Sequence, residues 1–252
     1  QMDKDIAEAY GLLKIDFLGL KNLSTIENAL AMIKRNHGVD VSLSSRELDM
    51  ADEKTLEVFC NNEGRPGTYG VFQFESRGMV EYLHKLQPKS LEDVIAMNAL
   101  YRPGPISNIP KYINRKNGKE AIDYYLPECE SVLNSTYGVL TYQEQVMNIS
   151  IIVGGFSRGE SDELRKAMAK KKKDYLLKSK EKFVQRAREK GYSEQDISRL
   201  WADMEKFGAY GFNRAHSACY SFIAYQTAYL KAHYPVEYMS ALMTTELADI
   251  AR

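Results

Sequence analysis

Most of the chain consists of segments with helical apolar periodicity that end at glycine or proline, and this punctuation restricts the fold more than any other feature. Apolar residues recur every three or four positions in stretches that close at Gly38, Pro88, Gly154-Gly155 and Pro235. Such spacing indicates amphipathic helices, and Gly and Pro are the residues that end them. The sequence therefore predicts a mainly α protein, a multi-helical domain with a few short strands.

Serines mark the starts of several of these helices. Ser90 precedes a periodic stretch that runs to Leu100, with an aspartate three residues later as a capping-box partner. A single long helix is expected from Ser157 or Ser161 to about Lys190, where a glycine follows.

Two short segments depart from the helical pattern. Residues 12–18 alternate between apolar and polar side chains, which predicts a strand with Lys14 and Asp16 on its polar face. Residues two apart on a strand lie about 6.5 to 7 Å apart on one face. A carboxylate there can bind Mg²⁺, and the neighbouring ammonium can hold a phosphate. The alternative is a polar strand face in water. Residues 70–75 predict a second, short extended segment.

The charge is balanced overall but divided unevenly along the chain. The 34 basic and 34 acidic residues cancel, yet residues 161–191 contain 12 Lys or Arg and only 5 Asp or Glu. A basic block in an otherwise acidic chain indicates a local anionic partner. A solvated charged helix is the alternative.

Several classes of protein are disfavoured by what the sequence lacks. It has no run of about 18 apolar residues and no signal peptide, and its three cysteines are widely spaced. We therefore expect a cytoplasmic protein with no membrane partner. The sequence also contains no P-loop, no G-x-G-x-x-G and no H-E-x-x-H, which argues against P-loop ATPases, Rossmann dehydrogenases and zincins.

The basic block contains two kinds of candidate anion ligand. Arg165 and Lys166 lie near the start of the expected long helix, whose N-terminus adds partial positive charge, so this pair suits a triphosphate. The lysines that follow suit a nucleic-acid backbone. They are Lys170, Lys171, Lys172 and Lys173.

Three further residues are candidate phosphate contacts. His216 follows a glycine-containing turn at the start of a helix rich in tyrosines, which can stack on bases. The alternatives are a cap or core role for His216 and ordinary packing for the tyrosines. Arg77 near a helix start and Arg102 at a proline-rich turn can contact an anion or pair with a carboxylate.

Six segments, in order, resemble the C family of bacterial replicative DNA polymerases, the polymerase III alpha subunits. The resemblance covers almost the whole chain, and each segment is far more specific than a lone glycine pattern. The segments are GLLKIDFLGL from Gly11, VFQFESRGM from Val71, ALYRPGP from Ala99, TYGVLTYQEQVM from Thr136, LRKAMAKKK from Leu164 and FGAYGFNRAHS from Phe207.

This resemblance implies a fold and a set of site residues. Residues 1–22 are expected to be the end of a palm domain with its catalytic strand, and residues 23–252 a multi-helical fingers domain. The family's palm has three catalytic carboxylates and two Mg²⁺ ions, and its third carboxylate, a metal ligand, falls on Asp16. The family's strand lysine falls on Lys14. The first two carboxylates belong to an upstream Asp-x-Asp segment that this chain lacks.

The resemblance also assigns the triphosphate site. The family's arginine pair, which binds the triphosphate of the incoming nucleotide, falls on Arg165 and Lys166. The second arginine is thus a lysine here, so a two-pronged guanidinium contact is replaced by a single ammonium charge. The family's usual Met-Gly-Lys is Met168-Ala169-Lys170, a mild departure.

The implied function is that of a DNA-directed DNA polymerase. The expected partners are primer–template DNA, dNTP and, through regions outside this chain, other subunits of the replicase holoenzyme. The chain by itself is expected to be inactive. A stand-alone, non-catalytic nucleic-acid-binding module is the alternative, and a structural or scaffold protein is a third reading.

Overall fold

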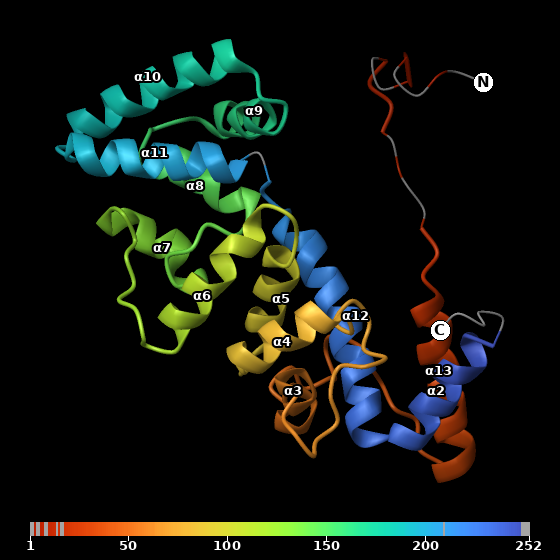
Figure 1. Cartoon of the computed structure of the whole chain (residues 1–252). Coiled ribbons are helices and arrows are strands. Elements are labelled where there is room, and N and C mark those ends of the chain that lie inside the picture. Colours follow the sequence, from red (N-terminus) through yellow and green to blue (C-terminus); the bar gives the residue numbers. More distant parts are fainter. Residues whose placement is uncertain are drawn as a thin grey trace. The chain divides into compact units, whose positions relative to one another are not determined.

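The computed structural model describes residues 3, 6–7, 10–13, 15, 18–208 and 210–247, and nearly all regular structure in this part is helical (Figure 1). This confirms the mainly α fold class. No helix among these residues is long and apolar enough to span a membrane. The helices of at least eight residues are α2 (Lys21–His37), α3 (Glu53–Cys60), α4 (Arg77–Leu86), α5 (Leu91–Leu100), α6 (Ile109–Lys116), α8 (Gln143–Ile152), α9 (Arg158–Ala169), α10 (Lys173–Glu189), α11 (Glu194–Gly208), α12 (Arg214–His233) and α13 (Pro235–Thr245).

Short helical turns connect the longer helices. They are the 3-10 turns η1 (Pro105–Asn108), η2 (Pro127–Cys129) and η3 (Asn134–Thr136) and the single α-helical turn α7 (Glu130–Leu133).

The chain divides into two compact units. The terminal unit comprises Gln1–Val41 and Val236–Arg252, and the main unit comprises Ser42–Pro235. In the terminal unit, Glu237 on α13 accepts a hydrogen bond from Asn36 and lies 2.7 Å from the Nε2 atom of His37. The expected boundary between palm and fingers at residue 22 stays a prediction.

Helix starts in the main unit follow the expected capping chemistry. The Ser90 side chain accepts a hydrogen bond from the backbone N–H of Asp93 at the start of α5. Asp52 does the same for Thr55 at the start of α3, at 2.8 Å. A side-chain oxygen satisfies one of the free backbone donors of the first helical turn.

The expected strands do not form in the described residues, where a parallel bridge between Tyr142 and Phe212 is the sole β pairing. Lys14 and Asp16 lie outside the described residues, and Leu12, Leu13 and Ile15 carry no strand. A strand needs a neighbour to pair its backbone groups, and sequence alternation alone does not provide one.

The prediction of an extended segment at residues 70–75 is wrong, because this segment folds as consecutive turns. The N–H of Val71 donates to the carbonyl of Thr68, and the N–H of Phe74 donates to the carbonyl of Val71. Gln73 adopts a left-handed conformation with φ of 68°. The turns bury Val71 and Phe74 completely, so burial rather than strand pairing fixes this conformation.

The expected long helix over residues 157–190 is also wrong, because α9 and α10 are separate helices. Lys171 has a φ of 52°, its N–H donates to the carbonyl of Met168, and the N–H of Lys172 donates to the carbonyl of Ala167. This pair of bonds around a left-handed residue is the Schellman ending of a helix, normally made by Gly or Asn. We call Lys170–Lys173 the lysine turn.

The apolar packing of the described part of the main unit includes a larger and a smaller core. The larger one forms among α8, α9, α10 and α11 around the fully buried rings of Phe183 and Trp201. The smaller one contains Ile95, Ala99 and Tyr142, with Phe212 packed against it. Helix α12 packs against α3 and α5. The smaller core therefore fixes the start of α8 against the segment that leads into α12.

Candidate functional site

The predicted triphosphate pair on α9 shares one carboxylate. Arg165 donates to Oδ1 of Asp162 through Nε at 3.0 Å and Nη2 at 2.8 Å, and the Nζ atom of Lys166 lies 2.7 Å from Oδ2. The hydrogen bonds from Lys166 and Arg165 lower the pKa of Asp162. The structure therefore places both predicted cations around the same pair of anionic oxygens.

Gln143, at the start of α8, connects Arg165 to residues 210–213, which precede α12. Its Oε1 atom accepts from Nη1 of Arg165 at 3.5 Å, and its Nε2 atom donates to the Gly211 carbonyl at 2.7 Å. The Gln143 N–H also donates to the Phe212 carbonyl at 2.9 Å. A Cβ at Gly211 would lie 2.9 Å from the Gln143 side chain, which explains the glycine.

Sequence reasoning did not select Gln143 as a site residue. Gln143 is uncharged and marks no helix cap, so the local sequence gives no signal for a site residue. Its partners lie 22 and 68 residues away in sequence. The signal was its place inside the segment TYGVLTYQEQVM, one of the six that carry the family resemblance.

Two carboxylates hold the start of α12. Glu144 accepts hydrogen bonds from the Asn213 side chain at 2.7 Å and from the Arg214 backbone N–H at 3.0 Å. The Nη2 atom of Arg214 lies 2.8 Å from both oxygens of Glu92 on α5. An anion at a helix N-terminus is stabilised by the free backbone N–H groups, so Glu144 occupies a natural anion position.

His216 lies in the first turn of α12 with its ring exposed. Its backbone N–H donates to the side chain of Asn213, the N-cap residue of α12, at 2.8 Å. The ring lies 5.1 Å from the Phe212 ring and 4.3 Å from the Tyr220 ring, measured between centroids. The backbone N–H of His216 is therefore used in the cap of α12, and its imidazole ring is exposed.

Arg102 and His216 line a common hollow of about 140 Å³. The Arg102 guanidinium lies 3.7 Å from the centre of the Phe212 ring, and its nitrogens donate to the carbonyls of Ala99 and Tyr210. Burial lowers the pKa of Arg102. Carbonyls and a ring face leave the positive charge of Arg102 unneutralised, unlike a carboxylate partner.

Arg77 lies outside this hollow, and the side chains of the lysine turn do not join it either. The Arg77 side chain is 93% exposed and pairs with Glu81 at 3.3 Å, which matches the carboxylate alternative. The four side chains of the lysine turn are exposed and form no ion pair with any described residue. We call Arg102, Arg165, Lys166 and Arg214 the cation cluster.

The predicted metal ligand cannot be placed. Asp16 lies outside the described residues, as does Lys14. Within the described ranges, no three His, Cys, Asp or Glu side chains gather closely enough to hold a metal ion. Because Mg²⁺ takes about six oxygen ligands, the described residues do not fit a magnesium site by themselves.

Comparison with known proteins gives a consistent result. A family model described as the bacterial DNA polymerase III alpha subunit finger domain matches residues 22–191. DNA polymerase III subunit alpha of Aquifex aeolicus (strain VF5) is 50% identical over 251 residues, which cover 99% of this chain and 21% of that protein.

Other relatives match over the same extent. The proteins of the same name from Thermus aquaticus and Bacillus subtilis (strain 168) are 46% and 44% identical, each over 99% of this chain. The matched regions are 20% and 22% of those two proteins. The chain thus spans about a fifth of the length of the curated relatives it matches.

Proposed function

Because the chain belongs to the family of bacterial DNA polymerase III alpha subunit finger domains, we propose that it acts as the fingers of a DNA-directed DNA polymerase. In this role Arg165 and Lys166 bind the triphosphate of the incoming dNTP. The matched relatives are about five times longer than this chain. Nucleotidyl transfer to a primer is therefore proposed for the longer protein, in which this chain is one part.

The observation that carries the proposal is the convergence of Arg165 and Lys166 on Asp162. The forked guanidinium meets one carboxylate oxygen and the ammonium meets the other. A triphosphate offers more oxygens and more negative charge than one carboxylate, so it can replace Asp162 as their shared partner.

Gln143 gives this site its geometry. It joins the arginine that would bind phosphate to the carbonyls of Gly211 and Phe212, within the loop that precedes His216. Triphosphate binding at Arg165 is thereby coupled to the position of that loop. Fingers that deliver a nucleotide need such a connection, because the bound triphosphate must be held in line with the primer 3′-hydroxyl.

We propose that Asp16 contributes one carboxylate to a Mg²⁺ site that other parts of the longer protein complete. Mg²⁺ would supply charge stabilisation for the attacking and leaving oxygens. In the complete polymerase, Asp16→Asn should abolish turnover and leave DNA affinity unchanged. A variant that keeps about a tenth of the wild-type kcat, a loss of only about 1.4 kcal/mol, rules out the metal-ligand role.

The lysine turn is proposed to contact the backbone of primer–template DNA. Its four ammonium groups are exposed and unpaired among the described residues. These lysines also support the second candidate function, a non-catalytic nucleic-acid-binding module. Such a module would use the lysine turn and would not require the pairing of Arg165 and Lys166 around one carboxylate.

A nucleotide titration distinguishes the two functions. We expect the 252-residue chain to bind dTTP at least about tenfold more tightly than dTMP in calorimetry, because the two additional phosphates can reach both α9 cations. Arg165→Ala should remove this preference, and the matched control Lys180→Ala on exposed α10 surface should keep it. Equal affinity for dTTP and dTMP in the unaltered chain would leave the nucleic-acid-binding module as the better reading.

A further inference from the structure

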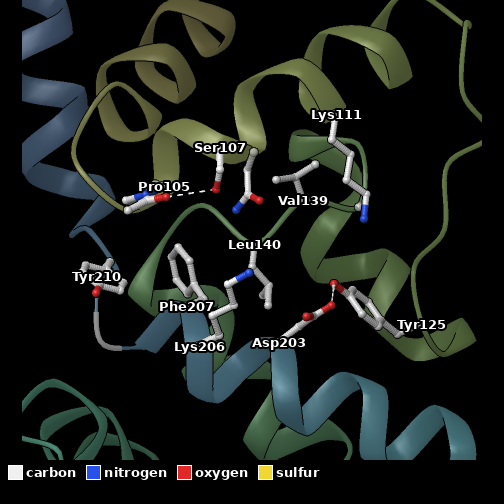
Figure 2. Close-up of a pocket in the computed structure, with 13 residues that line it drawn as sticks. Pro105, Ser107, Lys111, Tyr125, Val139, Leu140, Asp203, Lys206, Phe207 and Tyr210 are labelled. Carbon is white, nitrogen blue, oxygen red and sulfur yellow. Dashed lines mark hydrogen bonds between the residues drawn. The ribbon is translucent and has the colours of Figure 1, made fainter.

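A second cavity lies in the main unit, lined by residues distinct from the proposed triphosphate ligands. It has a volume of about 330 Å³, and we call it the α6–α11 cavity (Figure 2). One wall is formed by η1 and α6, the opposite wall by α11, and the floor by residues 138–140. The lining includes the polar side chains of Ser107, Asn108, Lys111, Asp203 and Lys206 and the apolar side chains of Val139, Leu140 and Phe207. A volume of this size is that of a small-molecule site.

Two lysines supply positive charge from opposite walls of the cavity. Lys111 comes from α6 and Lys206 from α11, and Figure 2 shows the Lys206 side chain extending from its helix towards the wall that holds Ser107. Neither ammonium forms a hydrogen bond or ion pair with a described residue. By contrast, Lys116, also on α6, pairs with Asp93 at 3.1 Å.

The carboxylate in the cavity already has a partner. Asp203 accepts a hydrogen bond of 2.7 Å from the hydroxyl of Tyr125. Burial, and then this hydrogen bond, raises the pKa of Tyr125, so its hydroxyl remains protonated and continues to donate. Two cations against one engaged carboxylate leave a net positive charge, which favours an anion and opposes a cation.

Apart from Ser107, Asn108 and the tyrosine hydroxyls, the remaining side chains of the lining are apolar. Val139, Leu140 and Phe207 are buried, and the Tyr210 ring closes the rim against Gly104. Gly104 has a φ of 101°, and a Cβ there would lie 2.8 Å from the Tyr210 ring. A larger residue at position 104 would therefore displace the ring, so this rim requires glycine.

We propose that the α6–α11 cavity binds a small aromatic phosphate ester, with its ring on Val139 and Leu140 and its phosphate between Lys111 and Lys206. A phosphate monoester carries about −1.5 to −2 charge at pH 7. It therefore balances two lysines on opposite walls better than a ligand with one carboxylate would. The apolar floor accounts for the ring. The site is independent of Arg165 and Lys166 and does not require the polymerase role.

Phenyl phosphate is the smallest probe that contains both parts. In the 252-residue chain with labelled methyl groups, its addition should shift the methyl signals of Val139 and Leu140, with a dissociation constant on the order of 1 mM. Phenol and inorganic phosphate, each carrying one part, should bind at least about fivefold more weakly. The Leu83 methyls, buried outside the cavity lining, serve as the reference and should not move.

Substitutions test the assignment of charge. Lys111→Gln and Lys206→Gln should each weaken phenyl phosphate binding about three- to tenfold, and Asp203→Asn should tighten it by up to about fivefold. Both lysines are exposed, and asparagine has the same shape as aspartate, so all three variants should keep the fold. Lys119→Gln, an exposed lysine outside the cavity lining, and Arg165→Ala should leave binding unchanged.

Three results would overturn the proposal. The first is the absence of any shift at Val139 and Leu140. The second is a shift that inorganic phosphate alone reproduces, which would mean an adventitious ion only. The third is competition by saturating dTTP, which would make the cavity part of the nucleotide site. A failed dTTP preference with intact phenyl phosphate binding would instead count against the proposed function alone.

Discussion

The cation cluster and the lysine turn both consist of basic side chains, but those of the cluster have partners within the protein and those of the turn have no ionic partner among the described residues. In the cluster, Arg165 and Lys166 share Asp162, Arg214 holds Glu92, and Arg102 lies on the Phe212 ring. In the lysine turn, no side chain of Lys170–Lys173 has an ionic partner among the described residues. Yet two members of the cluster, Arg165 and Lys166, lie in the second half of α9, directly before the lysine turn. The expected support for this pair from the positive N-terminal end of a helix is therefore wrong.

The difference separates two kinds of anion recognition. Paired cations are oriented before a ligand arrives, so they can select the geometry of one phosphate group or chain of phosphates. Unpaired exposed lysines are mobile point charges, and they attract any polyanion in a manner that salt weakens. We therefore expect substitutions in the cluster to change nucleotide kinetics and substitutions in the turn to change salt-dependent DNA affinity.

Arg165→Ala in the complete polymerase is expected to give the largest effect. Loss of a forked, charged hydrogen bond of about 1.5 to 3 kcal/mol corresponds to a loss of roughly 10- to 150-fold in kcat/KM for dNTP. DNA affinity should not change. Steady-state dNTP kinetics and DNA titrations at several salt concentrations check this. If the variant loses DNA affinity while dNTP kinetics stay constant, α9 is a backbone contact and the contrast between the regions disappears.

Gln143→Ala should produce a smaller loss of kcat/KM for dNTP, because Gln143 contacts Arg165 and helps to position it. It removes the hydrogen bond to the Gly211 carbonyl and the contact with Arg165, and one net hydrogen bond contributes about 0.5 to 1.5 kcal/mol. The expected loss is about 2- to 10-fold in kcat/KM for dNTP. Gln185→Ala, on exposed α10 surface, is the matched control. Equal kinetics for both variants would show that Gln143 does not position Arg165.

Lys172→Gln should change the response to salt. Loss of one backbone contact should lower the slope of log affinity against log salt concentration by about 0.9 for duplex DNA. Affinity should fall a few-fold at low salt, equally for all sequences, and dNTP kinetics should stay the same. An altered KM for dNTP with an unchanged salt slope would place Lys172 with the cation cluster instead.

Lys171→Gly should have the smallest effect, and it concerns stability. Lys171 has a left-handed backbone, which costs an L-residue about 1 to 2 kcal/mol and glycine little. Glycine also has more conformational freedom in the unfolded chain, which cancels part of this gain. The free energy of unfolding, measured by thermal denaturation, should therefore increase by about 0.5 to 1 kcal/mol.

Lys172→Gly is the matched control for that measurement. Lys172 has a φ of −77°, so glycine relieves nothing there and should slightly destabilise the chain. Equal changes at positions 171 and 172 would mean that the Schellman ending does not determine the break between α9 and α10.

The sequence by itself determined the helical class and much of the helix punctuation. Ser90 as a cap and Pro235 and Gly38 as stops act through backbone groups within one turn of themselves. Such interactions are local, so a one-dimensional pattern contains them. The family resemblance likewise rested on contiguous motifs, which is why it needed no coordinates.

Only the tertiary structure decided what is made by distant residues. Lysine gives no local signal for a left-handed helix end, so the break at Lys171 was not predicted. The contacts of Gln143 and the lining of the α6–α11 cavity join residues separated by 20 to more than 100 positions. Those juxtapositions follow from how the helices pack, because packing brings side chains together regardless of their separation along the chain.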